Sequence, residues 1–319
     1  MRLAILDDYQ RVALEMTDWS PLRERLEIAV FDRHLGAADA VAEALQDFEI
    51  VCIMRERTPF PASLLERLPR LKLLVTSGKR NDAVDMVAAA RCGITVCGTN
   101  SPGHATAELA FGLILALARS LTAEAASVRE GGWQIGLGRD LKGAVLGILG
   151  LGRLGSQVAG FGKAFGMDVI AWSENLTEAR AAEAGARRVL RDELLSAADF
   201  VTIHLRFSDR TQGLIGVREL ALMKRDAYLV NTSRGPIVDE QALIEALEQR
   251  RIGGAALDVY DMEPLPPDHR LRRTPNLLLT PHIGYVTRET YRVFYGEMVD
   301  IVQAFLEGRP RNVLSSDWP

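Results

Sequence analysis

The sequence predicts an α/β protein built from two doubly wound lobes, each a parallel sheet covered by helices on both faces. The 319 residues exceed the size at which one hydrophobic core keeps growing, and 48% of them are hydrophobic, enough to fill two cores. Short β-branched runs alternate with helix-like segments, a rhythm typical of parallel sheets. The alternation stops near Asn100, passes through a long apolar segment and begins again, which indicates a second lobe and a cleft between the two lobes.

The first lobe is predicted over residues 1–100, where each strand-like run is short and is followed by turn residues or a helical pattern. The helical patterns include "AADAVAEALQ" and "NDAVDMVAAARC". The expected strands, in chain order, are "RLAIL", "LEIAVF", "FEIVCIM", "LKLLVTS" and "GITVCG".

A long helix opens the second lobe. The segment "TNSPGHATAELAFGLILALARSLTAEAASVREGG" begins with turn residues, becomes apolar and ends at Gly131 and Gly132. Helices are predicted for "RLGSQVAGFGKAFG" and "DEQALIEALEQRR", and an amphipathic helix for the tail "RETYRVFYGEMVDIVQAFLEG". The expected strands of this lobe are "AVLGIL", "MDVIAW", "DFVTIHL", "AYLVNT", "GGAALDV" and "NLLLTP".

Charge and composition exclude several classes of partner. The net charge is −4 and the Lys and Arg residues are scattered, which argues against nucleic acid or an anionic membrane as the main partner. The opening "MRLAILDDY" lacks the pattern of a signal peptide, and the apolar run Leu109–Ala118 is too short to span a bilayer. We therefore expect a cytoplasmic protein.

Neither the cysteines nor the histidines indicate a metal site. Cys52, Cys92 and Cys97 form no CxxC pair and are predicted to be buried thiols in a reducing compartment. The five histidines show no HxxxH spacing and have no companion cysteines.

The segment "GLGRLG" places Gly150, Gly152 and Gly155 in GxGxxG spacing, directly after an apolar strand and before a helix. In that context Gly150 permits a tight turn, Gly152 lets the backbone approach a pyrophosphate, and Gly155 lets the helix pack closely on the strand. The start of the helix supplies N–H groups and a partial positive charge. The motif predicts a dinucleotide site; the alternative interpretation is a turn that merely needs small residues.

The next strand bears on the choice of dinucleotide. An acidic residue is expected at its tip, about 20 residues beyond the glycines, to hold the adenosine ribose. The tip has Ser173 and Glu174, and strand alternation allows either one to face the ribose. No arginine stands there to bind a 2′-phosphate, so NAD is favoured and NADP remains open.

Three later segments carry candidate catalytic residues. Arg234 in "LVNTSRGPIVDE", Asp258 and Glu263 in "ALDVYDMEP", and His282 in "LLLTPHIGY" each follow an apolar strand. The carboxyl ends of parallel strands are where open α/β sheets hold ligands, so these side chains can converge. Taken singly, each has an ordinary alternative as a surface cation, a loop carboxylate or a turn residue.

Together, "GLGRLG", "NTSRGPIVDE", "ALDVYDMEP" and "TPHIG" resemble the D-isomer-specific 2-hydroxyacid dehydrogenase family over nearly the whole chain. "TSGKRNDAVD" is similar to the substrate loop of that family and "NSPGHATAELAFG" to the segment that opens its interlobe helix. "TIHLRFSDRTQGLI" resembles the loop over the cofactor but has Arg206 and Phe207 where a Pro-Leu pair is common. The resemblance implies a Rossmann nucleotide-binding domain, residues 101–284, inserted in a flavodoxin-like substrate domain, residues 1–100 plus 285–319.

The resemblance also implies a mechanism. Arg234 would grip the carboxylate and carbonyl of a 2-oxo acid while the nicotinamide delivers a hydride and His282 donates a proton. Glu263 would hold the far ring nitrogen of His282, and Asp258 would lie on the nicotinamide side. Further residues are carried over as lining the cofactor groove: Thr106, Arg153, Leu154, His204, Thr211, Thr232, Ser233 and Gly284.

Substrate selection is expected to depend on the first lobe, where backbone N–H groups around Ser77 and Gly78 would hold the carboxylate. Arg55 could bind a distal phosphate or carboxylate, as could Lys79 and Arg80, although all three could equally be solvated surface cations. Glyoxylate, hydroxypyruvate and larger 2-oxo acids stay open. Formate fits poorly, because it offers no carbonyl to protonate.

Two further expectations concern partners. Relatives of this fold include corepressors that sense NAD without turning it over, so an NAD-sensing binding protein is the alternative function. The set of Arg234, Glu263 and His282 favours an enzyme, since binding alone needs no acid–base pair. The apolar helix around Leu109 to Leu121 and the following "TAEAASVREGGW" predict a homodimer packed there; the alternative is a helix of the interlobe core.

Overall fold

The computed structural model describes residues 1–315, and the chain divides into two compact units. One unit contains Met1–Pro102 and the segment from Val286 onward, and the other contains Gly103–Tyr285. Each is built on one sheet in which all paired strands are parallel, which confirms the predicted α/β class.

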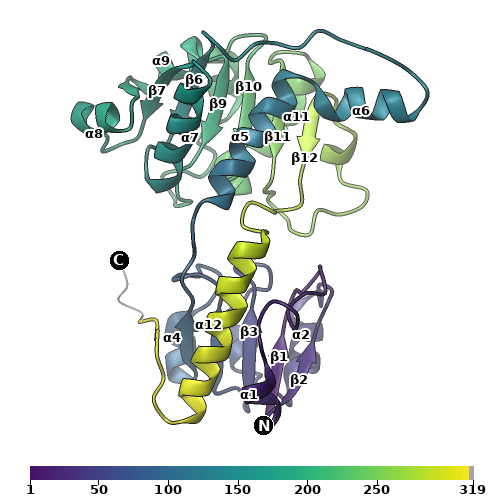
Figure 1. Cartoon of the computed structure of the whole chain (residues 1–319), viewed down its shortest axis with the longest axis vertical. Helices are drawn as coiled ribbons and strands as arrows, with labels where there is room; N and C mark the ends of the chain where they lie inside the picture. Colours follow the sequence, from purple (N-terminus) through teal and green to yellow (C-terminus); the bar gives the residue numbers. More distant parts are fainter. Residues whose placement is uncertain (316–319) are drawn as a thin grey trace. The chain divides into compact units, whose positions relative to one another are not determined.

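The first unit has a five-stranded sheet in the order β2-β1-β3-β4-β5. This is the flavodoxin-like order, in which the chain reverses direction across the sheet beside β1. Figure 1 labels β1, β2 and β3 of this sheet. Strands β3 and β4 are buried at every residue, as expected for strands with helices on both sides. The strands are β1 (Arg2–Ile5), β2 (Glu27–Val30), β3 (Ile50–Ile53), β4 (Leu73–Thr76) and β5 (Thr95–Gly98).

The helices of this unit are mostly short, and the long C-terminal helix packs against β4 and α1. They are α1 (Ser20–Arg23), α2 (Ala38–Leu45), α3 (Ala62–Leu65), α4 (Met86–Arg91) and α12 (Arg288–Leu306). After α12, the tail pairs with the edge of the sheet: the N–H of Gly98 donates to Asn312 and that of Leu314 to Val96. The tail therefore covers the hydrogen-bonding edge of β5.

The second unit has a seven-stranded sheet in the order β12-β11-β10-β9-β6-β7-β8. The first six strands in sequence follow the Rossmann order, with the direction of winding reversed between β6 and β9. The strands are β6 (Val145–Leu149), β7 (Asp168–Trp172), β8 (Arg187–Arg188), β9 (Phe200–Ile203), β10 (Tyr228–Asn231), β11 (Gly254–Leu257) and β12 (Leu277–Leu279).

Two apolar clusters cover the two faces of this sheet. One gathers α5 and α7, which pack on each other, and the other gathers α9, α10 and α11. The helices are α5 (Ala105–Ala118), α6 (Leu121–Arg129), α7 (Arg153–Ala164), α8 (Glu178–Glu183), α9 (Arg191–Ala197), α10 (Val217–Leu222) and α11 (Glu240–Glu248), with 3-10 turns at η1 (Gly235–Ile237) and η2 (Arg270–Arg273).

The length of the helices and the grouping of possible metal ligands bear on membranes and metal ions. Within residues 1–315, no single helix is long and apolar enough to cross a membrane; only α5 and α6 taken together, bent by 62°, pass on length and composition. In the same range no cluster of three or more His, Cys, Asp or Glu residues could hold a metal ion.

The cysteines correct one prediction. Cys52 and Cys97 are buried, and burial raises the pKa of their thiols to about 12 and about 11. Cys92 is exposed, because it lies at the C-terminal end of α4, where the chain turns toward β5. The prediction that all three are buried is therefore wrong for Cys92.

Candidate functional site

The glycine motif forms an open turn between β6 and α7 (Figure 1). Gly150 has φ +100°, and a Cβ there would lie 2.7 Å from the carbonyl carbon of His204. A Cβ at Gly155 would lie 2.1 Å from the carbonyl oxygen of Gly150, so α7 packs directly on the turn. A Cβ at Gly152 would meet no atom within 4 Å, and no side chain caps the start of α7. The turn therefore offers open space beside backbone N–H groups, as a diphosphate requires.

At the tip of β7, Ser173 contacts the glycine turn and Glu174 does not. Oγ of Ser173 accepts a hydrogen bond from the backbone N–H of Leu151, at 2.9 Å, inside the glycine motif. Glu174 is exposed. A neutral hydroxyl, and not a carboxylate, therefore stands against the turn.

Other predicted cofactor residues lie around the carboxyl ends of β9 and β10. The hydroxyl of Thr232 is buried and has no hydrogen-bond partner within the described chain, so it can serve a bound molecule. Ser233 donates its hydroxyl to the carbonyl of Leu205 at 3.0 Å. Burial lowers the pKa of His204 to about 4, and its Nε2 lies 3.0 Å from Oγ1 of Thr202. An orphan hydroxyl and an open glycine turn at one sheet edge fit a dinucleotide.

Three of the residues predicted to line the cofactor groove make contacts within this unit. Thr211 donates its hydroxyl to the carbonyl of Arg206 at 2.8 Å and so closes a turn in the loop after β9. The guanidinium of Arg153 lies against Gly103, and Leu154 packs on the apolar cluster beneath α7.

Arg234 follows β10 in a turn shaped by Asn231, a fully buried residue that the sequence did not single out. Oδ1 of Asn231 accepts the N–H of Ser233 at 3.0 Å, and Nδ2 donates to the carbonyl of Arg234 at 2.9 Å. The side chain of Arg234 is partly exposed, with Nη1 donating to the carbonyl of Ser233 at 2.8 Å. The turn therefore places a guanidinium at the carboxyl end of the sheet.

His282 and Glu263 form a direct pair, with Nδ1 of the ring 2.6 Å from Oε2 of the carboxylate. The other oxygen, Oε1, accepts the backbone N–H of Tyr260 at 2.9 Å. The side chains of His282 and Glu263 are 17% and 28% exposed. A carboxylate fixed by the backbone thus orients an imidazole and leaves Nε2 as the nitrogen that can exchange a proton.

Asp258 fixes the segment that carries His282. Its buried carboxylate accepts the hydroxyl of Thr280 at 2.6 Å and the N–H groups of Ile283 and Gly284, both at 2.8 Å. Burial raises the pKa of Asp258, and these hydrogen bonds oppose the rise. His282 has φ +53°, a left-handed conformation that non-glycine residues seldom adopt, so this support is needed. The predicted contact of Asp258 with the nicotinamide stays a prediction.

Two glycines connect these segments to their neighbours. A Cβ at Gly235 would lie 2.1 Å from the carbonyl carbon of Tyr260, so the residue after Arg234 abuts the peptide between Tyr260 and Asp261. A Cβ at Gly284 would lie 3.2 Å from both Asp258 and Thr106. The arginine, the pair of Glu263 and His282, and Thr106 are therefore linked by close contacts within one unit.

In the first unit, the predicted substrate residues belong to a tightly bonded loop after β4. The N–H of Ser77 donates to Ile53 at 3.1 Å, and the N–H of Gly78 donates to the hydroxyl of Thr99 at 2.9 Å. Both groups are used within the unit, and the prediction that backbone N–H groups around Ser77 and Gly78 hold a substrate carboxylate stays a prediction. A sequence cannot show that Thr99, on a different segment, takes the N–H of Gly78.

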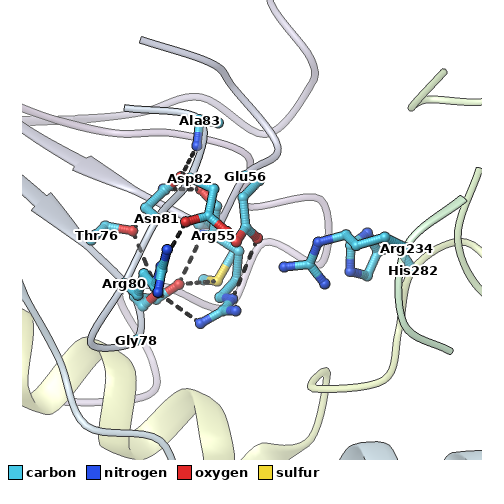
Figure 2. A network of polar contacts seen from close by, with 12 residues as sticks. Arg55, Glu56, Thr76, Gly78, Arg80, Asn81, Asp82, Ala83, Arg234 and His282 are labelled. Atoms are coloured by element: carbon cyan, nitrogen blue, oxygen red, sulfur yellow. Dashed lines mark hydrogen bonds and ion pairs between the residues drawn. The ribbon is translucent and has the colours of Figure 1, made fainter. Parts of the chain in front are cut away.

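Arg55 and Asn81 hold this loop together (Figure 2). The backbone N–H of Arg55 donates to Oγ of Ser77 at 2.9 Å, and its carbonyl accepts Nδ2 of Asn81 at 2.7 Å. Asn81 also donates to the hydroxyl of Thr76 at 2.9 Å. A Cβ at Gly78 would lie 2.0 Å from Nη1 of Arg55, so the guanidinium lies across that glycine. Asn81 is a structural residue of the loop that sequence reasoning missed.

Lys79 and Arg80 lie on the exposed rim of the same loop. Nε of Arg80 donates to Asp82 at 2.7 Å, and both residues line a shallow hollow of about 380 Å³ whose wall also includes Asp82 and Asp85. Carboxylates in the hollow offset the cations, which favours the interpretation of Lys79 and Arg80 as solvated surface charges.

Known proteins resemble this chain over most of its length. Residues 111–284 match the family "D-isomer specific 2-hydroxyacid dehydrogenase, NAD binding domain". The chain is 42% identical to glyoxylate reductase of Aeropyrum pernix over 80% of its length and 79% of that protein. It is 35% identical to glycerate dehydrogenase of Methylorubrum extorquens over 87% and 89% of the two chains.

A solved structure extends this likeness to both units. Phosphoglycerate oxidoreductase of Vibrio cholerae matches with a TM-score of 0.92 at 35% identity, covering 97% of this chain and 99% of the other. The glycine turn, the orphan hydroxyl of Thr232 and the pair of Glu263 and His282 thus occur in a chain whose sequence and fold agree with one set of enzymes. The chain belongs to the D-isomer specific 2-hydroxyacid dehydrogenase family and is an NAD-binding oxidoreductase.

Proposed function

We propose that this protein transfers a hydride between a nicotinamide and a D-2-hydroxy acid/2-oxo acid pair. The observation that carries the proposal is the 2.6 Å contact between Glu263 and His282, because a pure binding protein needs no oriented acid–base group. In reduction, Nε2 of His282 donates a proton to the carbonyl oxygen of the substrate. In oxidation the same nitrogen accepts the proton from the hydroxyl group. Glu263 holds Nδ1 and stabilises the imidazolium that forms.

Arg234 is the proposed anchor of the substrate. A guanidinium presents parallel N–H donors that match a carboxylate and its neighbouring carbonyl through charge-assisted hydrogen bonds. Its place after β10 fits this role, since ligands of open α/β sheets bind at the carboxyl ends of the strands.

The glycine turn and Thr232 would hold the dinucleotide, with its diphosphate at the start of α7. When bound, the dinucleotide supplies or accepts the hydride. The chain's own part is to position the ring, exclude water and handle the proton. Ser173 would face the adenosine ribose with a neutral hydroxyl.

The substrates we favour are small 2-oxo acids such as glyoxylate and hydroxypyruvate. Two relatives support them, a glyoxylate reductase and a glycerate dehydrogenase. Lys79 and Arg80 are candidates to bind a distal phosphate of the substrate. They share their hollow with carboxylates, which disfavours a phosphorylated substrate. The first unit is the proposed substrate-selecting domain.

Kinetics with a panel of 2-oxo acids test this function. NADH and NADPH are mixed in parallel with glyoxylate, hydroxypyruvate and 3-phosphohydroxypyruvate, and the loss of nicotinamide absorbance is followed. We expect turnover with the first two acids. A protein that binds NADH but shows no absorbance loss with any acid would instead support the NAD-sensing alternative. His282→Asn should lower kcat by orders of magnitude and leave NADH binding nearly intact.

We also propose that the protein forms a homodimer. Its interface would consist of α6 and the segment 131–138; this segment is called the arm. Helix α6 buries none of its residues, and Trp133, Ile135 and Leu137 of the arm are exposed apolar side chains. Clustered exposed apolar groups are typical of association surfaces. Sedimentation should give a dimer for the wild type and a monomer for Leu137→Asp combined with Trp133→Asp. Val87→Asp, an exposed position in the first unit, is the control.

A further inference from the structure

Four hydrogen bonds around the pair of Glu263 and His282 form a closed circuit. The N–H of Tyr260 donates to Oε1 of Glu263 at 2.9 Å, and Oε2 of Glu263 lies 2.6 Å from Nδ1 of His282. The N–H of His282 donates to the carbonyl of Thr280 at 3.1 Å. The hydroxyl of Tyr260 donates to the same carbonyl at 2.8 Å and so completes the circuit; its contact with the carbonyl of Leu257 is longer, at 3.3 Å.

Tyr260 takes part at two points, once through its backbone and once through its side chain. The residue is 8% exposed, and its ring is held in the apolar cluster beneath α11. Burial, with the nearby charges of Asp258 and Glu263, raises the pKa of the phenol, so the hydroxyl remains a donor throughout the usual pH range. Because the phenol ties the ring to Thr280, it also fixes the backbone of residue 260, whose N–H aims at Glu263.

The carbonyl of Thr280 is the point that needs this support. It accepts the N–H of His282 two residues on, a tight turn around Pro281 that leads into the left-handed conformation of His282. Asp258 holds the two flanks of the turn, through the hydroxyl of Thr280 and the N–H of Ile283. The phenol of Tyr260 is the side-chain donor that the structure gives to the carbonyl itself.

We propose that Tyr260 is a positioning residue for the proposed hydride-transfer reaction, whose phenol closes the circuit and holds Glu263 and His282 in register. The proposal rests on the proposed function, in that the pair it positions is the proposed acid–base group. Tyr260 contacts neither the substrate nor the cofactor in this proposal. It acts through the carbonyl of Thr280 and the carboxylate of Glu263.

The test is Tyr260→Phe, which removes one hydroxyl and keeps the buried ring. We expect kcat for the reduction of glyoxylate to fall about three- to tenfold, the size expected for one hydrogen bond. KM for glyoxylate, Kd for NADH and the melting temperature should stay near their wild-type values. Tyr291→Phe is the matched control, because that phenol donates to Oε1 of Gln10 in the first unit and should leave kcat unchanged.

A double-mutant cycle shows whether Tyr260 acts through Glu263. In a Glu263→Gln background the further loss from Tyr260→Phe should shrink to less than about twofold, since groups of one network are not additive. If Tyr260→Phe costs the same factor with and without Glu263→Gln, the residue does not act through this carboxylate and the proposal is overturned.

Nitrogen-15 NMR of the histidine rings gives a readout that needs no turnover. His282 is assigned by its absence in His282→Asn. We expect the strongly hydrogen-bonded Nδ1 proton of His282 to move upfield or exchange faster in Tyr260→Phe, while Tyr291→Phe leaves it in place. If the wild type reduces no 2-oxo acid but this NMR change occurs, the proposed function fails and the positioning role stands. An unchanged resonance together with an unchanged kcat overturns the role of Tyr260.

Discussion

The amide of Asn231 bridges the turn that presents Arg234, accepting the N–H of Ser233 and donating to the carbonyl of Arg234 at 2.9 Å. Asn231 is fully buried at the end of β10, and its two partners, Ser233 and Arg234, are partly exposed. The orientation of the guanidinium therefore depends on a buried residue three positions earlier in the chain.

Replacing Asn231 with Ala should weaken substrate binding more than it weakens cofactor binding. Two partly buried backbone groups lose their partners, which costs about 0.5–1.5 kcal/mol for each hydrogen bond in the free energy of unfolding. We expect kcat/KM for the 2-oxo acid to fall about tenfold or more, since misplacing a binding group is costly. Steady-state kinetics and denaturant unfolding measure the two effects. Asn231→Asp keeps the acceptor for Ser233 but sets a buried carboxylate oxygen against the carbonyl of Arg234, so it should not restore the stability. Equal kcat/KM in wild type and Asn231→Ala would contradict the argument.

The variant Gly235→Ala tests the contact between the turn that carries Arg234 and the segment that carries Glu263. A Cβ at Gly235 would lie 2.1 Å from the carbonyl carbon and 2.3 Å from the carbonyl oxygen of Tyr260, and backbone atoms cannot rotate away. Gly235→Ala must therefore displace the peptide between Tyr260 and Asp261, which adjoins the Tyr260 N–H that holds Glu263. We expect a loss of about 1–3 kcal/mol in the free energy of unfolding and a drop in kcat of about a hundredfold.

The control for this variant is Gly160→Ala, on an exposed position of α7 where a Cβ would meet no atom within 4 Å. That change should be neutral or slightly stabilising, because glycine disfavours a helix relative to alanine. If Gly235→Ala keeps wild-type kcat, the close contact between the two segments does not position the acid–base pair.

The second lobe could be predicted well because its information is local. A GxGxxG spacing between a strand and a helix, and polar residues directly after apolar strands, are visible in a single sequence, and the family and fold confirm what they indicate. The close pair of Glu263 and His282 is also present as expected. The roles of these residues in catalysis remain proposals.

The rest depends on contacts between distant segments. The residues of "TSGKRNDAVD" do not show that the N–H of Gly78 donates to the hydroxyl of Thr99. Nor do they show that Asp85 accepts the N–H of Ala88 and caps α4, so that this helix begins only at Met86. Tyr260 and Asn231 look like ordinary strand-end residues, and only the folded chain brings their polar groups to Thr280 and Arg234.

The stability of the second unit should depend on pH through Asp199. Burial raises the pKa of this carboxyl, but the N–H of Val145, at 2.7 Å, and the charges of Lys224 and Arg139 outweigh it and hold the pKa below the ordinary 3.8. A lowered folded-state pKa gives stability that is fully present above the unfolded value and is lost as the pH falls through the folded value. Asp199→Asn should therefore be less stable than the wild type at pH 7, by about 1–3 kcal/mol.

Thermal unfolding between pH 3 and pH 7 measures the difference, which should shrink as the pH falls below 3.8. Asp226→Asn is the matched control. Asp226 also pairs with Arg139, at 3.3 Å, but its side chain is 73% exposed, so its loss should have little effect. A difference between wild type and Asp199→Asn that stays constant down to pH 3 would contradict the assignment.

Ser173 gives a prediction on the choice between NADH and NADPH. Its hydroxyl accepts the N–H of Leu151, so the point of β7 closest to the glycine turn carries no negative charge. We expect the wild-type Kd for NADPH to lie within about tenfold of that for NADH, because no carboxylate there repels the 2′-phosphate. Ser173→Asp keeps an acceptor for Leu151 and adds the missing charge, which should raise the Kd for NADPH about tenfold to a hundredfold. The Kd for NADH should change little.

Nicotinamide fluorescence titrations measure the Kd values of both cofactors for the wild type and for Ser173→Asp. The control is Ser173→Ala, which leaves the N–H of Leu151 without an acceptor and should weaken the binding of both cofactors alike. If Ser173→Asp leaves the ratio of the two constants at its wild-type value, the residue that faces the ribose must be sought elsewhere, first at Glu174.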